Sequence, residues 1–196
     1  MKVKSVILGS SSQQRKSLLL SVGIPFKVVS PEVDESFEHD LSPASAVSKI
    51  AQRKAYAVRE KVGLEHWIIA ADTGIIINNR LVGKPADKII ASKNLEKISG
   101  ETHFVVSGVA LSIPNQKIDI QVVFTKVKFK RLTVQEKNWY LSTNEWSGAA
   151  GGYRIQGCAS LLIEEIHGSY SNVQGLPLET VYRMLIGSGF DFGFST

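Results

Sequence analysis

The sequence predicts an α/β fold, with a mixed sheet and helices on its faces. Short apolar runs typical of strands alternate with helical patterns in the first half, and two long strand-like runs follow one another later. The 196 residues, 43% hydrophobic and 21% charged, suit one globular domain that spans residues 1–196. We find no internal repeat and no Pro/Gly-rich linker that would indicate a boundary inside it.

The first part of the chain alternates strand and helix. The apolar run Val3–Leu8 predicts a strand, and the hydroxyl side chains of residues 10–12 can cap the helix that follows. A second strand is expected at Phe26–Val29. Ser42 and Pro43 form a cap and first-turn pair for the next helix. The apolar face of this helix carries Ala46, Val47, Ile50, Ala51 and Val58.

The middle of the chain predicts a third strand, Trp67–Ala71, that leads to Asp72. Residues Ile75–Ile77 stay extended until Asn78-Asn79 turns the chain, and a returning strand follows. A helix over Lys88–Ile98 is expected to stop at the glycine of Ser99-Gly100.

Two long strands, His103–Ile113 and Ile118–Phe129, are expected to form a hairpin through Pro114-Asn115. The capping box Thr133-x-x-Glu136 then opens a helix to about Leu141. The remaining predicted elements are a glycine-rich loop at 148–152, a strand at Leu161–Ile166 and a helix at Pro177–Ile186.

Composition excludes several classes of protein. The apolar runs fall far short of the roughly 20 residues of a spanning helix, and the N-terminus has no signal-peptide core, which predicts a cytoplasmic protein without a membrane partner. The single cysteine, Cys158, cannot form an internal disulfide. The four widely spaced histidines lack the spacing of a zinc site. Neither a Walker A motif nor a dinucleotide-binding glycine motif occurs.

The net charge of +5 indicates anionic partners, with phosphate-bearing substrates weakly favoured. A nucleic-acid binder would use the basic run Lys126–Arg131. The alternation of basic and apolar residues in that run favours a half-buried strand with one wet face instead.

Several polar residues stand where a core would not need them. The segment Ser10–Arg15 lies between a strand and a helix, where backbone N–H groups and a guanidinium can hold phosphate. The same residues could instead be a simple helix N-cap with solvated polar side chains. Lys54 lies close to an apolar helix face, where lysines usually extend to solvent. Asp72 ends an apolar strand, the usual position of chemistry in α/β proteins, but it could also cap a turn. Lys84 on the returning strand could lie beside Asp72, and Asp34-Glu35 adds a second acidic pair.

Two acidic positions with lysines and an arginine are typical of a site for a metal-bound polyphosphate. Carboxylates hold Mg²⁺ through oxygen, and the cationic side chains neutralise phosphate oxygens. Water activated by a carboxylate or by the metal can then attack phosphorus.

These residues fall within an ordered series of motifs that resembles the Maf (septum-formation-inhibitor) family over nearly the whole chain. The order of the motifs makes the resemblance specific. The motifs are Ile7–Ser12 with Arg15, Asp34-Glu35, Ala51–Ala55, Ala71–Thr73, Leu81–Pro85, Ile98–His103, Ala150–Gly157 and Tyr170–Leu178.

The resemblance implies a nucleoside triphosphate pyrophosphatase that cleaves the α,β bond and releases a monophosphate and diphosphate, with Mg²⁺ or Mn²⁺. It also implies a curved sheet in two lobes around a central cleft, as in Maf and ITPase-like proteins, and a homodimer without nucleic acid. Asp72 is then the catalytic carboxylate and, with Glu35, a metal ligand. Thr73 and Gln156 match the dTTP/UTP type. The implied phosphate or substrate contacts are Ser10, Gln14, Arg15, Lys54, Thr73, Lys84 and Gln156.

The chain departs from the family at a few positions. Gln13 and Gln14 replace the usual proline and first arginine of the first motif, Gly74 stands where a β-branched residue is usual, and Ala149 where lysine is common. These departures leave an alternative open. The protein could be a regulatory nucleotide binder that affects cell division without turnover.

Overall fold

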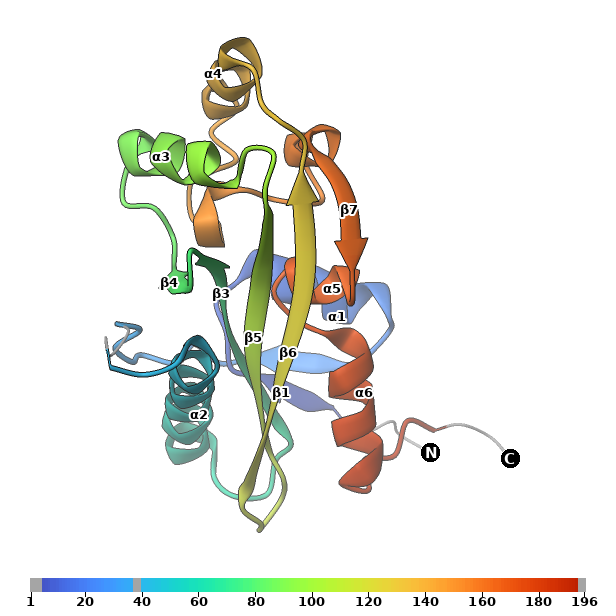
Figure 1. Ribbon diagram of the computed structural model, residues 1–196. Coiled ribbons are helices and arrows are strands. Elements are labelled where there is room, and N and C mark those ends of the chain that lie inside the picture. The colour runs from blue at the N-terminus through green and yellow to red at the C-terminus, as the bar shows by residue number, and fades with distance from the viewer. Residues whose placement is uncertain (1–4, 37–39, 194–196) are drawn as a thin grey trace. The chain divides into compact units, whose positions relative to one another are not determined.

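The computed structural model describes residues 5–36 and 40–193, so the predictions for Val3, Lys4 and His39 lie outside the described residues. Figure 1 shows helices on either side of a sheet. The elements are β1 (Val6–Leu8), α1 (Gln13–Ser21), β2 (Phe26–Val28), α2 (Pro43–Val62), β3 (Ile68–Ile77), β4 (Arg80–Val82), α3 (Lys88–Ile98), β5 (Thr102–Ser112), β6 (Ile118–Phe129), α4 (Val134–Ser142), the 3₁₀ turns η1 (Ala150–Gly152) and η2 (Cys158–Leu162), β7 (Ile163–His167), α5 (Tyr170–Val173) and α6 (Leu178–Gly187).

The sheet is mixed, as predicted. Its strand order is β2-β1-β3-β5-β6-β7, with β4 paired to β3. Strand β1 is parallel to both β2 and β3, whereas the β3–β4 and β6–β7 pairs are antiparallel. The α/β fold with flanking helices is therefore confirmed.

Side-chain caps set the starts of the predicted helices. The Ser12 side chain caps α1, Ser42 caps α2, and Thr133 with Glu136 forms the expected capping box of α4. Helix α3 ends at Ile98, and Gly100 follows with a φ of 74°, a conformation that glycine adopts without strain.

Three local predictions differ from the structure. The predicted strand that leads to Asp72 and the predicted extended segment Ile75–Ile77 form one continuous strand, β3. Strand β7 begins at Ile163, because the preceding residues form η2. The short helix α5 lies in the stretch between the predicted strand and the last helix and was not predicted.

The chain divides into two compact units. Unit 1 comprises Met1–Asp72, Ser107–Val123 and Gly175–Thr196, and unit 2 comprises Thr73–Val106 and Phe124–Gln174. Strands β3, β5 and β6 each contribute residues to both units.

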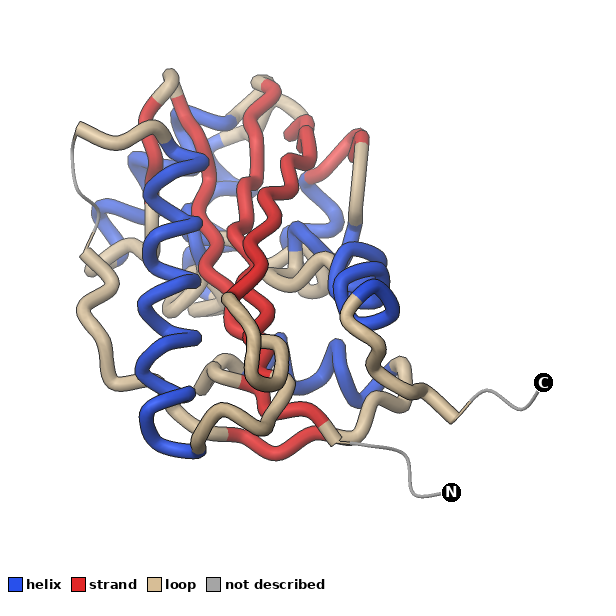
Figure 2. The backbone as a smooth tube through the Cα atoms, turned by 90° about the horizontal axis from the view of Figure 1, so that it is seen from below, coloured by secondary structure: helices blue, strands red, loops and turns tan. Residues whose placement is uncertain are grey.

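In unit 1 the sheet carries helices on both faces. Alternate strand residues point to opposite faces. On β3, Ile69 and Ala71 pack into a cluster with residues of α1 and α6, whereas Ala70 packs against the alanines of α2. Figure 2 shows α2 as the long helix that runs beside the strands.

Helix α2 lies unusually close to β5. A Cβ atom placed on Gly108 would be 2.6 Å from the backbone oxygen of Val47 and 2.8 Å from the backbone nitrogen of Ser48. Only glycine permits this approach without movement of the helix. The backbone of α2 is thus held against the sheet in unit 1.

In unit 2 the sheet has one buried face. The core of this unit includes Ile75 and Ile77 from β3, with further residues from α3, β5, β6 and α4. The alternate residues of β5 and β6, among them Phe104 and Phe124, are exposed.

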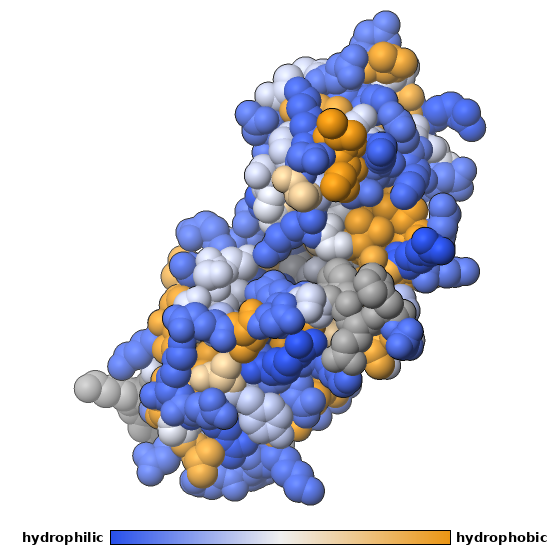
Figure 3. Space-filling model, turned by 90° about the vertical axis from the view of Figure 1, so that its left-hand side faces the viewer, coloured by the Kyte–Doolittle hydropathy of each residue, from blue (hydrophilic) through white to orange (hydrophobic). Residues whose placement is uncertain are grey.

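Figure 3 shows a surface on which hydrophobic residues form separate groups among hydrophilic ones. Across the described ranges 5–36 and 40–193, we find no helix that is both long and apolar enough to cross a membrane.

Candidate active site

A buried lysine joins two carboxylates in unit 1. The Lys54 ammonium donates a hydrogen bond of 2.8 Å to Asp72 Oδ1 and forms an ion pair of 2.9 Å with Glu35 Oε1. The Lys54 side chain is only 3% exposed, and Asp72 is also buried, whereas the Glu35 side chain is 47% exposed. A charged lysine at this depth needs such partners, because burial of an unpaired ammonium is very unfavourable.

Helical and strand periodicity together explain this contact. Lys54 follows Ile50 and Ala51 by four and three residues, so it belongs to the buried face of α2. Asp72 has the same strand parity as Ala70, whose side chain packs against that helix. The lysine therefore does not extend to solvent, as lysines at such positions usually do, but points to the sheet.

Asp72 lies in the middle of β3, yet it lies past the end of β1. The parallel pairing of β1 with β3 reaches only Leu8 and Ile69, and the antiparallel pairing with β4 begins at Ile75. The loop that leaves β1 contains Ser10. Asp72 therefore lies just beyond the carboxyl end of the parallel pair of β1 and β3. Catalytic and binding residues of α/β proteins commonly lie at this end of parallel strands.

The loop after β1 is fixed by Arg15. Ser10 Oγ accepts hydrogen bonds from the backbone N–H of Ser12, at 3.2 Å, and from Arg15 Nη1, at 3.1 Å. Arg15 Nε also donates to the backbone oxygen of Gly175, at 2.8 Å. Because Ser10 accepts both bonds, its hydroxyl hydrogen can be donated to a ligand.

Electrostatics couple this loop to the carboxylates. Burial lowers the pKa of the Arg15 guanidinium, and the charges of Asp72 and Glu35 act in the opposite direction. Arginine nonetheless stays protonated in proteins. Arg15 and Lys54 thus place two cationic side chains beside the carboxylates of Asp72 and Glu35.

The carboxylate oxygens of Asp72 and Glu35 suit a hard divalent cation whose remaining ligands are water and substrate. Oxygens of Asp72 and Glu35 lie 2.8 and 2.9 Å from one cationic nitrogen, so the two carboxylates are close together. Within residues 5–36 and 40–193, no group of three or more His, Cys, Asp or Glu side chains could hold a metal. Mg²⁺ commonly uses one or two carboxylates and completes its shell with water and substrate phosphates.

The structure brings Ser10, Arg15, Glu35, Lys54 and Asp72 together within unit 1. The half-buried Gln14 lies on α1 of the same unit. Thr73 follows Asp72 on β3, and Lys84 and Gln156 are exposed residues of unit 2. The expected position of Lys84 beside Asp72 stays a prediction.

Asp34 is bonded within its own turn. Its carboxylate accepts hydrogen bonds from the Ser36 hydroxyl, at 2.6 Å, and from the Ser36 backbone N–H, at 2.8 Å, in an exposed local turn. These bonds lower the pKa of Asp34. The sequence analysis did not predict that the Gly175 carbonyl accepts a hydrogen bond from Arg15. The available signal was the motif Tyr170–Leu178, which contains this glycine.

The sequence matches the family described as Maf-like protein over residues 5–187. The chain belongs to the Maf family. A dTTP/UTP pyrophosphatase of Symbiobacterium thermophilum is 41% identical over 96% of each chain. Enzymes with the same name are 37% identical in Rhizobium meliloti, over 96% of this chain and 94% of the relative, and 40% identical in Dictyoglomus thermophilum, over 95% and 97%.

A solved dITP/XTP pyrophosphatase of Mycobacterium abscessus aligns with 66% of this Maf chain and 76% of its own, with 20% identity and a TM-score of 0.42.

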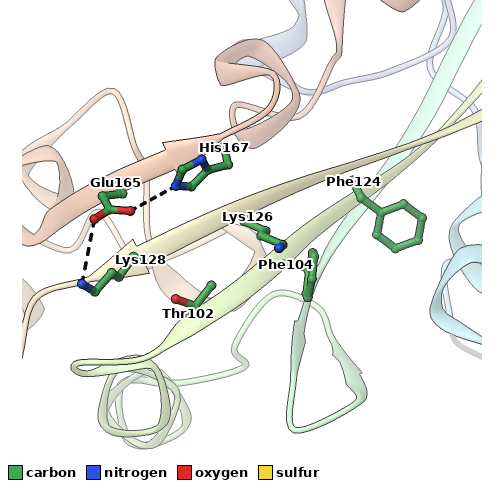
Figure 4. Close-up of a pocket in the computed structure, with 7 residues that line it drawn as sticks. All are labelled: Thr102, Phe104, Phe124, Lys126, Lys128, Glu165 and His167. Atoms are coloured by element: carbon green, nitrogen blue, oxygen red, sulfur yellow. Dashed lines mark hydrogen bonds and ion pairs between the residues drawn. The ribbon is translucent and has the colours of Figure 1, made fainter.

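Unit 2 of this Maf protein has a separate groove of about 510 Å³ on the open face of its sheet (Figure 4). Phe104 and Phe124 form an edge-to-face pair with ring centroids 6.4 Å apart, and the Lys126 ammonium lies 5.7 Å from the Phe104 ring centroid. Such a surface can pack aromatic or cationic groups.

Two of the four basic residues in the run beside this groove are paired with acids. Lys128 forms an ion pair of 3.1 Å with Glu164, and Lys130 pairs with Glu136. Burial alternates along the run, with Val127 and Phe129 in the core. The prediction of a half-buried strand with one wet face is confirmed.

Proposed function

We propose that this Maf protein is a nucleoside triphosphate pyrophosphatase that acts on dTTP and UTP. The names of the relatives, over nearly the full length of the chain, support this activity. The observation that carries the proposal is the cluster of buried Lys54 and Asp72 with the exposed Glu35, beside the loop of Ser10. It combines a base, cationic groups and metal ligands in one unit.

Asp72 is the base of the proposed reaction. In the protein without nucleotide, the Lys54 bond to Asp72 Oδ1 orients the carboxylate. In the reaction, a carboxylate oxygen of Asp72 accepts a proton from the attacking water. The water oxygen forms a bond to the α-phosphorus, and the bond between that phosphorus and the bridging oxygen breaks. Nucleoside monophosphate and diphosphate are the products.

The cationic and hydroxyl groups bind the phosphates. Ser10 donates its hydroxyl hydrogen, and Lys54 and Lys84 contribute ammonium groups. Arg15 also belongs to the phosphate site, and its bonds to Ser10 and Gly175 hold the loop in position. Gln14 adds an amide contact where the family usually has arginine.

Asp72 and Glu35 would hold Mg²⁺ or Mn²⁺, which neutralises phosphate charge and lowers the pKa of a bound water. The two carboxylates support this requirement, because they repel the phosphate oxygens of a triphosphate unless a cation accompanies it.

Thr73 and Gln156 select the pyrimidine base in this proposal, since both match the dTTP/UTP type. The protein is also expected to act as a cytoplasmic homodimer, by its resemblance to the family. Sedimentation equilibrium tests the dimer, and a monomeric mass at micromolar concentration would contradict it.

The activity is tested by a product assay with Mg²⁺ and with Mn²⁺ across dTTP, UTP, CTP, GTP and 7-methyl-GTP. We expect dTTP and UTP to yield the monophosphate and diphosphate in equal amounts. Nucleotide binding by calorimetry without any product would favour the regulatory role that Gln14 and Ala149 leave open.

A further inference from the structure

Lys54 has an unusual set of partners for a phosphate-binding lysine. In the described part of the chain, its ammonium is held by Asp72 and Glu35, the same carboxylates that the proposed function assigns to the metal. The ammonium is buried, so water cannot replace these partners. The carboxylates therefore already bind a cation, and that cation belongs to the protein.

We infer that Lys54 is an internal competitor of the divalent cation: it keeps the metal affinity of the free enzyme low until a triphosphate supplies the ammonium with other anionic partners. The inference rests on the proposed function, because it takes Asp72 and Glu35 as the metal ligands. It assigns Lys54 a regulatory role at the site in addition to phosphate binding.

Charge repulsion is the physical basis. A divalent cation that bonds to Asp72 and Glu35 would lie close to an ammonium that has just lost its acceptors, and the interior screens that repulsion poorly. The ammonium cannot remain unpaired at this depth. Phosphate oxygens offer it a replacement for both carboxylates.

Metal and nucleotide are then coupled. A triphosphate that attracts Lys54 raises the affinity for the cation, and the cation raises the affinity for the triphosphate by the same factor. The exposed Glu35 is the more accessible of the two carboxylates and is expected to change partner first.

Another lysine of α2 provides a matched control. Lys61 forms an ion pair of 3.4 Å with Glu32, but its side chain is 41% exposed. A surface pair of this kind contributes little and can be separated without cost to the interior. Substitution of Lys61 removes the same charge from the same helix without removing a partner of the buried Asp72.

The experiment measures Mn²⁺ binding to nucleotide-free protein by the loss of the free-ion EPR signal. We compare wild type, Lys54→Met, Lys54→Gln and Lys61→Met. We expect both Lys54 variants to bind one Mn²⁺ about tenfold or more tightly than wild type. The Lys61 variant should resemble wild type, and Asp72→Asn in the Lys54→Met background should remove the gain.

Thermal unfolding gives a second readout, since a bound ion stabilises only the folded state. Mn²⁺ should raise the Tm of the Lys54 variants more than that of wild type. A Lys54 variant that unfolds cooperatively but binds Mn²⁺ no more tightly than wild type overturns the inference. Release of diphosphate by wild-type protein, measured in parallel, tests the proposed function separately.

Discussion

Substitution of Gly108 by alanine tests whether the close approach of α2 to the sheet positions the site. The new Cβ would lie 2.6 Å from the Val47 oxygen and 2.7 Å from the Val47 carbonyl carbon, and ordinary contact begins at 3.4 Å. These are backbone atoms, so no side-chain rotation relieves the overlap. The helix must retreat by up to about 0.8 Å.

Overpacking of this kind costs about 1–3 kcal/mol. For a protein of this size, a loss of about 2 kcal/mol lowers the Tm by about 4–8 °C. Lys54 lies two turns further along the same helix, so its ammonium moves with the backbone. A displacement of about 1 Å near the reacting groups can cost about a hundredfold in rate, and we expect a loss of about tenfold to a hundredfold in dTTP turnover.

The assays are thermal unfolding by circular dichroism and diphosphate release. Gly187→Ala, at the end of α6, is the matched control, because no atom lies within 4 Å of its added Cβ. Its Tm should equal or exceed that of wild type. A Gly108→Ala protein with wild-type Tm and wild-type turnover would refute the argument.

Three further variants test separate parts of the structure. Arg15→Lys cannot bond Ser10 and Gly175 in the planar geometry of a guanidinium, so we expect a loss of about 1–3 kcal/mol in urea unfolding and a raised KM; unchanged values would contradict the role of Arg15. Gln14→Arg supplies the charge usual in the family and should lower the KM for dTTP about threefold or more with little change in kcat, whereas a fall in kcat would count against this position as a simple phosphate contact. Burial lowers the pKa of His103 to about 4, so the unfolded chain binds more protons between pH 6.5 and 4, and stability should fall as pH decreases through that range. His103→Asn should flatten this part of the pH profile, and an unchanged slope would exclude His103 as its source.

Local signals predicted most of the fold. The hydroxyl cap at Ser42 placed the start of α2, and the glycine after Ser99 placed the end of α3, because these signals lie within a few residues of the helix ends. Extended backbone was predicted on both sides of Asp72, but not that the two segments form one strand, since a carboxylate and Gly74 interrupt the apolar pattern. Pairing with β4 stabilises this segment, and that pairing depends on tertiary contacts.

The site was predicted as a set of residues rather than as an arrangement. Periodicity placed Lys54 near an apolar helix face, but only the packing of α2 on the sheet shows that its ammonium is buried against Asp72. The bond between Arg15 and Gly175 joins residues 160 positions apart, and no local pattern encodes it. Asp34 and Glu35 are neighbours in sequence, yet only Glu35 reaches Lys54.

The most direct test of the central claim is diphosphate release from dTTP by Asp72→Asn, with Asp34→Asn as the control on an exposed carboxylate. The account predicts a loss of about 10²–10⁴-fold in kcat for Asp72→Asn, because the base is removed, and near wild-type turnover for Asp34→Asn. Both variants must show a cooperative unfolding transition. Full turnover by Asp72→Asn would contradict the assignment of this site.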